Sequence, residues 1–269
     1  MEEKVKMSPA IDPSSWKNRP MNDFSPLHRI CSYLAMFPPN LANYFIHRFS
    51  REGDTVFDPF AGRGTTPLEA VLQDRKALGS DLNPLAVWLT RGKVTAPRGE
   101  GGMKKVLKRL EELEEEYKLE EDSYKEEAKT IKDEGPRGSG VGVVYSIGTL
   151  QTLLFLRKRL VVQDLNEVTD IDCFIVAIIL GAMHGQTDSY FSVSMPNTFS
   201  MSPSYIEKYV EQHDLNYPDY NIFNIIRERS AVALRLLNEK KPNATIKRAD
   251  ATKVAEAFDG KEVSLVFSS

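Results

Sequence analysis

The chain has 269 residues, of which 41% are hydrophobic, enough to bury the core of one large domain or of one domain with an insertion. Its net charge of −3 excludes a surface coated throughout with nucleic-acid-binding charge, but it permits a local basic patch. The two cysteines lie far apart, and neither the polar N-terminus nor the short apolar run at 173–183 is a signal peptide or a membrane span. We therefore expect a cytoplasmic protein with no membrane partner.

The first 97 residues predict helices followed by a parallel α/β unit. After an extended lead-in at 1–25, a helical pattern runs from 27 to 49 and is broken at Pro38 and Pro39, so that a helix restarts near Asn40. Strands and helices then alternate, with strands at 55–57 and 76–80 and helices at 67–73 and 84–91. This alternation is typical of a parallel sheet that is covered by helices.

Residues 98–240 predict a mostly helical insertion. The charged stretch 104–134 carries apolar residues at helical spacing and predicts a solvated amphipathic helix or a helical hairpin. Further helices are expected at 147–160, 170–184, 204–213 and 220–239. Strands return at 244–248 and 262–267, so three parts are predicted: 1–97, the insertion 98–240, and a resumed sheet at 241–269.

A Gly-rich turn, DPFAGRGTT, joins the first predicted strand to the helix that follows. Glycine permits positive φ and close approach of a ligand, and the N–H groups that open a helix attract electron-rich groups. No Lys follows Gly64, which excludes a P-loop, and Pro67 replaces the third glycine of the dinucleotide fingerprint, which disfavours NAD. S-adenosylmethionine is the remaining class of ligand, and Asp58 and Asp81 supply acids one β-α-β step apart for its ribose.

The stretches VFDPFAGRGTTPLEA and GSDLNPLA resemble motifs I and II of the amino-methyltransferases that act on adenine N6 or cytosine N4 of DNA. The usual motif I of that family has a serine where Arg63 stands here. Upstream, LHRICSYLAMFPPNLANYFI resembles motif X, with His28, Phe37 and Pro38 at the matching positions. Downstream, ATIKRADATKV and KEVSLVFSS resemble the segments that lead into the catalytic motif.

This resemblance implies an α/β, Rossmann-like class I methyltransferase sheet that uses S-adenosyl-L-methionine as cofactor and DNA as substrate. It places Asp250 near the adenine ring of the cofactor and the motif X segment over its methionine end. The implied cofactor-binding residues are Asp58, Phe60, Gly62, Gly64, Thr66, Asp81, Asp250, Phe37 and Pro38. The aspartates have an alternative role as helix caps, since Asp is favoured there.

The catalytic motif of this family, Pro-Pro-Tyr preceded by Ser, Asn or Asp, receives the flipped base. The sequence ends at Ser269, where that motif would begin, and neither SMPN at 194–197 nor MSPSY at 201–205 replaces it. We therefore expect an incomplete sheet, no catalytic residue and no activity of this chain alone. Three alternatives explain the missing motif. A second polypeptide carries it, the chain is a shortened form of a longer enzyme, or the chain is a non-catalytic binding subunit.

The insertion is a candidate for target recognition or for a lid over the cleft. Its stretch HGQTDSYFSVSMPNTFSMSPSY contains aromatic, hydroxyl and amide side chains suited to contacts with bases, namely Gln186, Ser189, Tyr190, Phe191, Asn197, Phe199 and Tyr205. An RNA base methyltransferase is an alternative, because the same motifs occur in such enzymes.

Overall fold

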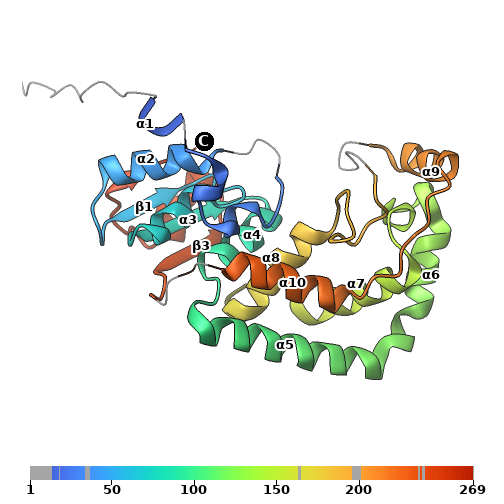
Figure 1. Cartoon of the computed structure of the whole chain (residues 1–269). Helices are drawn as coiled ribbons and strands as arrows, with labels where there is room; N and C mark the ends of the chain where they lie inside the picture. The colour runs from blue at the N-terminus through green and yellow to red at the C-terminus, as the bar shows by residue number, and fades with distance from the viewer. Residues whose placement is uncertain are drawn as a thin grey trace, which may run out of the picture.

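The computed structural model describes residues 14–17, 19–33, 37–162, 165–195, 201–235, 237 and 240–268. A four-stranded sheet in the order β3-β2-β1-β4 forms one side of the molecule, and a helical part extends from it (Figure 1). The strands are β1 (Thr55–Asp58), β2 (Lys76–Asp81), β3 (Ala244–Arg248) and β4 (Leu265–Val266). All neighbouring pairs are parallel. The predicted Rossmann-like sheet with a helical insertion is confirmed.

The helices before and within the sheet part differ from the prediction in two places, since the lead-in at 1–25 contains two short helices and the stretch after residue 27 differs as well. They are α1 (Ser14–Lys17), η1 (Met21–Asp23), η2 (Pro26–Arg29), α2 (Pro39–Phe49), α3 (Thr65–Leu72), α4 (Pro84–Val94), η8 (Ala251–Lys253) and α11 (Val254–Ala257). The prediction of a helix that begins near residue 27 is wrong, because among the described residues before α2 only the 3-10 turn η2 forms at that position. Helix α2 begins with a proline at its first position, where the missing N–H costs no hydrogen bond.

The last strand is also shorter than predicted. Residues 262–264 are not in a strand, and β4 comprises only Leu265 and Val266. It is still tied to β1 at both ends, because Ser264 N–H donates to Thr55 O (2.8 Å) and Phe267 N–H donates to Phe57 O (3.0 Å).

The insertion is helical throughout its regular elements. These are α5 (Gly99–Glu120), η3 (Glu121–Tyr124), α6 (Lys125–Glu134), η4 (Gly135–Arg137), η5 (Val141–Val143), α7 (Ile147–Leu160), η6 (Leu165–Glu167), α8 (Asp170–Ala182), α9 (Pro203–Gln212) and α10 (Ile222–Leu234). The stretch 104–134 is neither a single helix nor a hairpin, because α6 turns away from the end of α5 (Figure 1).

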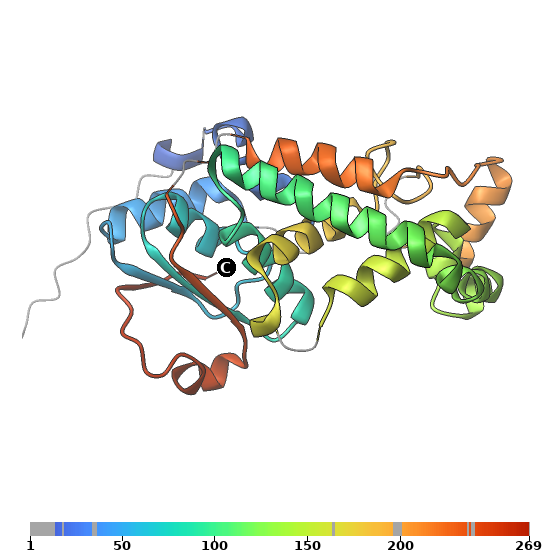
Figure 2. The same cartoon turned by 90° about the horizontal axis from the view of Figure 1, so that it is seen from below.

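The apolar stripe predicted along α5 is buried. Val106, Leu110 and Leu113 are fully buried, and α5 packs along α10, as the two helices lying side by side in Figure 2 show. The charged face of the helix therefore remains outside while the stripe joins the core. Among the residues that the structure describes, no helix combines the length and apolarity that crossing a membrane requires.

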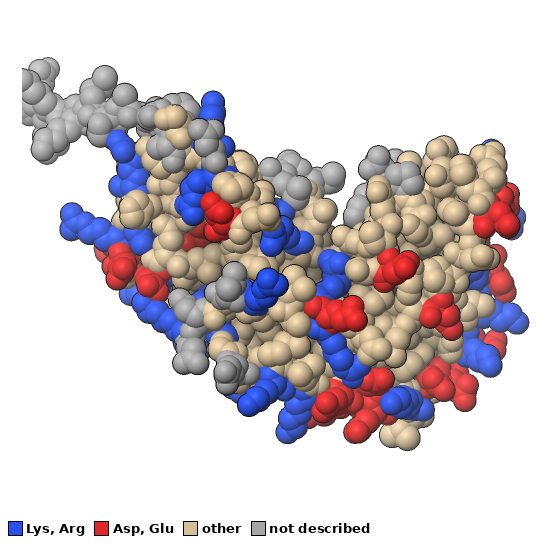
Figure 3. Space-filling view, in the orientation of Figure 1, with Lys and Arg blue, Asp and Glu red and all other residues tan. Residues whose placement is uncertain are grey.

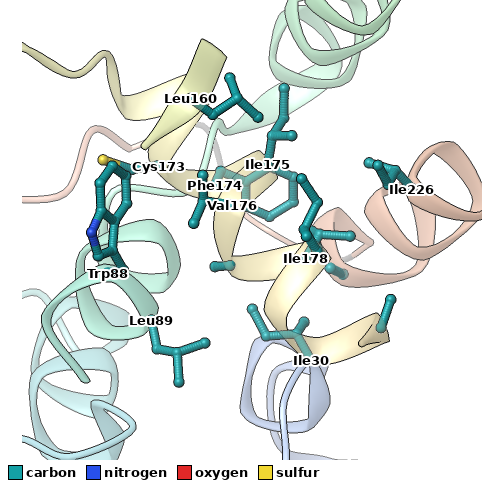
Figure 4. Packing of buried hydrophobic residues seen from close by; sticks show 14 of the residues in the cluster. Ile30, Trp88, Leu89, Leu160, Cys173, Phe174, Ile175, Val176, Ile178 and Ile226 are labelled. Carbon is teal, nitrogen blue, oxygen red and sulfur yellow. The ribbon is translucent and has the colours of Figure 1, made fainter. Parts of the chain in front are cut away.

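One hydrophobic core joins the sheet part to the insertion. Trp88 and Leu89 of α4 belong to the same buried cluster as Phe174 and Ile178 of α8 (Figure 4). The contact between α4 and α8 is close because Gly92 of α4 has no side chain where it meets α8. A Cβ at Gly92 would lie only 2.4 Å from the carbonyl oxygen of Cys173. The insertion is thus packed on the helix that follows β2.

Candidate functional site

The carboxyl ends of the strands bring the three predicted aspartates to one edge of the sheet. Asp58 ends β1, Asp81 ends β2, and Asp250 follows closely on β3. The register places Asp58 beside Gly79 and Asp81 beside Arg248. Ligands of open parallel sheets bind outside this edge, which makes it the candidate site.

The Gly-rich turn after β1 requires both of its glycines. Gly62 and Gly64 have φ values of 50° and 79°, in the left-handed region that favours glycine. Gly64 directly precedes α3, and a Cβ on it would lie 2.6 Å from the Thr90 hydroxyl oxygen of α4. The Thr90 hydroxyl also donates to Gly62 O (3.0 Å). Contacts of Thr90 on helix α4 therefore fix the shape of the turn.

We predict that Gly64→Ala destabilises the fold by about 2 kcal/mol, through the left-handed φ and the clash with Thr90. Gly53→Ala is the matched control, because Gly53 has a φ of 84° but its added Cβ would meet nothing within 4 Å. Urea denaturation of both variants separates the cost of φ, which they share, from the cost of the clash. Equal losses in the two variants would contradict the close approach of Thr90.

Asp81 is the residue that joins the turn to the end of β2. One carboxylate oxygen accepts the N–H of Gly62 (2.8 Å), and the other accepts the N–H of Asn83 (2.8 Å). A carboxylate has about four acceptor positions, so Asp81 keeps capacity for further hydrogen bonds. Asn83 in turn caps α4 and donates from its amide to the Tyr33 hydroxyl (2.9 Å).

Asn83 and Tyr33 are site residues that the sequence reasoning missed. The signal for Asn83 was present, since Asn before Pro84 and Leu85 is a typical helix cap. Tyr33 carried no local signal, because it reaches the site only through the packing of the segment that follows η2. A Cβ at Gly62 would lie 3.8 Å from its ring, which places Tyr33 beside the turn.

Asp58 and Thr66 support the turn from inside. Asp58 is 3% exposed and Thr66 is 1% exposed. The Asp58 carboxylate accepts the N–H of Phe60 (3.0 Å). Burial raises the pKa of Asp58, while the Ser268 hydroxyl, the Phe60 N–H and the Thr66 hydroxyl oppose this by favouring the ionised form. The two side chains therefore hold the loop and the C-terminal segment together.

Exposed apolar side chains follow the ends of β1 and β2. Phe60 is 60% exposed and Leu82 is 64% exposed, and Leu85 on the first turn of α4 is 40% exposed. Only Phe60 was predicted as a site residue. Apolar side chains after two neighbouring strands suit a flat ring that inserts between polar contacts.

The motif X-like segment lies against the start of α3. Phe37 O accepts the Thr65 hydroxyl (3.3 Å), and the Phe37 ring packs on Phe267 (centroids 5.4 Å apart). Pro38 is exposed and precedes α2. His28, however, is buried with its Nε2 2.7 Å from Glu69 Oε1, so it is a core residue and does not lie over a ligand.

Two buried cations under the turn were not anticipated. Arg63, in the position where the related motif has serine, is 8% exposed, and its Nε donates to the Thr65 hydroxyl (3.4 Å). Lys93 of α4 is 2% exposed and donates from Nζ to Arg63 O. Burial, with a smaller effect of the Arg63 charge, lowers the pKa of Lys93 to about 7.

Asp250 is exposed at the end of β3. It caps η8, since its Oδ1 accepts the N–H (2.9 Å) and the hydroxyl (2.8 Å) of Thr252. These hydrogen bonds lower the pKa of Asp250. The capping role that the sequence offered as an alternative is present, and the carboxylate remains accessible at the candidate edge.

Only some of the side chains predicted to contact bases are exposed to solvent. Phe191 is 1% exposed and therefore belongs to the core. The Arg229 guanidinium lies over the Tyr190 ring (4.7 Å to the centroid). Tyr205 is 48% exposed and stacks on Tyr209. Gln186 and Ser189 are exposed, whereas Asn197 and Phe199 lie outside the described residues.

A parallel sheet in the order β3-β2-β1-β4, with a Gly turn after β1 and acids ending β1 and β2, defines a Rossmann-like fold. Residues 12–90 match the sequence profile of the N6/N4 DNA methylase family. These residues therefore support a relationship of this part of the chain to the N6/N4 DNA methyltransferase family, the family that the sequence resembles.

Curated methyltransferases are similar to short stretches of the chain. An orphan methyltransferase of Bacillus amyloliquefaciens, M.BamHII, is 49% identical over 49 residues, which is 18% of each chain. The type II methyltransferase M.MjaII of Methanocaldococcus jannaschii is 36% identical over 58 residues, 22% of this chain and 11% of that one. M.MvaI of Kocuria varians, also type II, is 35% identical over 71 residues, 25% and 16% of the two chains. The matches thus span less than a fifth of each relative, and no solved structure matches the chain.

Proposed function

We propose that this chain is the S-adenosylmethionine-binding part of a cytoplasmic DNA methyltransferase that modifies an exocyclic amine, adenine N6 or cytosine N4. The observation that carries the proposal is the hydrogen bond from Gly62 N–H to the Asp81 carboxylate (2.8 Å). It joins the turn of motif I and the acid of motif II into one unit at the carboxyl edge of the sheet. The N6/N4 DNA methyltransferase family, whose profile residues 12–90 match, uses this cofactor and this class of substrate.

The residues at the edge fit the cofactor in kind. Asp81 has acceptor capacity for the ribose hydroxyls, and Phe60 and Leu82 offer apolar contacts to the adenine ring. The carboxylate of Asp250 suits the exocyclic amine of that ring. Gly62 and Gly64 shape the turn for close approach of the methionine end. The cofactor, when bound, supplies an activated methyl group, and these residues hold and orient it.

The other predicted residues act indirectly in this proposal. Asp58 and Thr66 are buried, so they contribute by holding the turn in place. Phe37 and Pro38 border the start of α3 and complete the wall on the side of the methionine end. No residue of this chain is assigned to catalysis. We propose that a Pro-Pro-Tyr segment, brought by a second polypeptide or a longer form of the protein, receives the base.

We predict that Asp81→Ala weakens S-adenosylmethionine binding by roughly 10- to 100-fold, because charged acceptors contribute about 1.5–3 kcal/mol per lost pair of hydrogen bonds. Isothermal titration calorimetry measures this directly. Asp54→Ala is the matched control, since its carboxylate also accepts a backbone N–H (Arg51, 2.8 Å) but lies at the opposite end of β1.

Titrations with other ligands separate the alternatives. Unchanged affinity in Asp81→Ala would remove this residue from the site, and absence of binding to the unchanged protein would refute the proposal. Binding of NAD in place of S-adenosylmethionine would indicate a dehydrogenase. Methylation of RNA but not of duplex DNA, after addition of a partner that carries the catalytic motif, would favour an RNA enzyme.

A further inference from the structure

A cavity of about 570 Å³ lies between the sheet part and the helical insertion, and we call it the basic cleft. Its walls come from the last turn of α4, the first turns of α5 and α8, and the strand β3 with the residues before it. The lining residues that carry the argument are Arg91, Arg98, Lys105, Lys241, Lys247 and Asp170. None of the candidate cofactor residues Asp58, Asp81 and Asp250 lines it.

The cleft is lined mainly by positive charge, although the net charge of the whole chain is negative. Five cationic side chains line it, opposed by the single carboxylate of Asp170, although the chain as a whole carries a net charge of −3. Asp170 is engaged with Arg91 at 3.6 Å, and Arg91 also donates to Val168 O (2.9 Å). Arg91 is therefore held in place, and the Lys247 ammonium donates to Ala257 O, so the excess of positive charge in the cleft comes mainly from Arg98, Lys105 and Lys241.

The secondary structure adds to this positive potential. Helix α5 begins at Gly99 and helix α8 begins at Asp170, and the first turns of both helices line the cleft. Backbone N–H groups at helix N-termini carry partial positive charge and attract anions. Within the described ranges, no strand pairs with the outer edge of β3, which forms another wall.

The surface around the cleft has the same sign. Lys105 and Lys241 are exposed at its rim. In the view of Figure 3, lysines and arginines are numerous over the sheet part, with some acidic side chains among them, and the lower part of the helical insertion carries both signs. The positive charge is thus spread over several elements and an open surface, which suits a polyanion that extends beyond the cleft.

We propose that the basic cleft binds phosphate groups of the DNA backbone. The choice of DNA as the polyanion rests on the proposed function, but the site is distinct from the cofactor edge. Lysine and arginine contacts to phosphate fix the position and orientation of a duplex and carry no direct sequence information. The cleft therefore supplies affinity and orientation rather than sequence specificity.

The test is a salt titration of DNA binding to the full chain and to the double variant Lys105→Gln, Lys241→Gln. Both side chains are exposed, so the substitutions leave the core untouched. Fluorescence anisotropy with a short labelled duplex, between about 50 and 200 mM salt, measures the affinity and its salt dependence. The matched control is Lys125→Gln, Lys129→Gln, which removes the same charge from exposed positions on α6.

We expect the double variant to bind the duplex about tenfold more weakly at low salt, with a salt slope smaller by about 2, as the loss of two phosphate contacts requires. The control variant should bind as the unchanged protein does. An equal loss in both variants, or no loss in either, would overturn the proposal, and so would failure of the unchanged protein to bind DNA at low salt.

Two further measurements distinguish the sources of phosphate and the two proposals. Tight binding of inorganic triphosphate, lost in the cleft variant while DNA binding is unaffected, would show a small-anion site and overturn the DNA assignment. In calorimetry, the cleft variant should bind S-adenosylmethionine with the same affinity as the unchanged protein. If that ligand fails to bind at all while the DNA result holds, the proposed function fails and the basic cleft stands.

Discussion

Gly181→Ala is expected to destabilise the chain by about 4 kcal/mol, or to prevent its folding. Gly181 lies in α8, and a Cβ built on it would stand 1.6 Å from the carbonyl oxygen of Ile30. The clash is with backbone, so no side chain can rotate away, and the helix or the segment after η2 has to move. Overpacking of this kind costs about 1–3 kcal/mol in adaptable sites and more where the backbone resists.

The matched control is Gly101→Ala. Gly101 is also helical, in α5, but an added Cβ there meets nothing within 4 Å. Alanine is the better helix former, so this variant should gain roughly 0.5 kcal/mol. Urea denaturation followed by circular dichroism gives both values. A Gly181→Ala protein as stable as the unchanged chain would show that α8 does not approach Ile30 as closely as described.

Stability is expected to rise with pH between 7 and 8.5 because of Lys93. Its pKa is about 7 in the fold against an ordinary value of 10.5, because burial disfavours the charged form. Between these two values the unfolded chain binds the extra proton, so the free energy of unfolding increases with pH. The slope approaches about 1.4 kcal/mol per pH unit, or about 2 kcal/mol over the window.

Lys93→Met is the variant that isolates this effect. Methionine is similar in length and cannot titrate, so its unfolding free energy should lack that rise over the same window. The neighbouring titratable groups are Arg63, Cys31 and His28. The pKa of the Cys31 thiol is raised from 9.0 by burial, so its opposing contribution begins above the window. Parallel curves for the two proteins would contradict a buried, neutral Lys93.

The position of the Gly-rich turn and of Asp81 at one edge of the sheet could be predicted from the sequence because the signals are local. Gly62 and Gly64 are required by the turn itself, and Asp81 follows a strand whose apolar residues are contiguous in the chain. Such patterns fix the end of a strand and the start of a helix without reference to the rest of the fold. The strand at 55–57 and the helices at 147–160 and 170–184 were found for the same reason.

The features that could not be predicted from the sequence depend on contacts between residues that are far apart in the chain. Arg63 and Lys93 look like surface cations, and only the meeting of α4 with the turn shows that they are buried. His28 matched a motif position, yet its partner Glu69 lies 41 residues away in the chain. The basic cleft is assembled from segments around residues 91, 105, 170 and 241, which no local pattern connects.

The parallel pairing of β2 with β3 has a consequence during synthesis on the ribosome. Residues 82–243 separate the two strands, and at 5–20 residues per second they take roughly 8 to 30 s to translate. During that interval the outer side of β2 in the nascent chain has no strand to bond. Helix α4 is made at its start and α8 only about halfway through it, after which the two helices can associate. The helices thus shield the unfinished protein before its sheet is complete, and an mRNA that pauses inside this region would prolong the aggregation-prone stage.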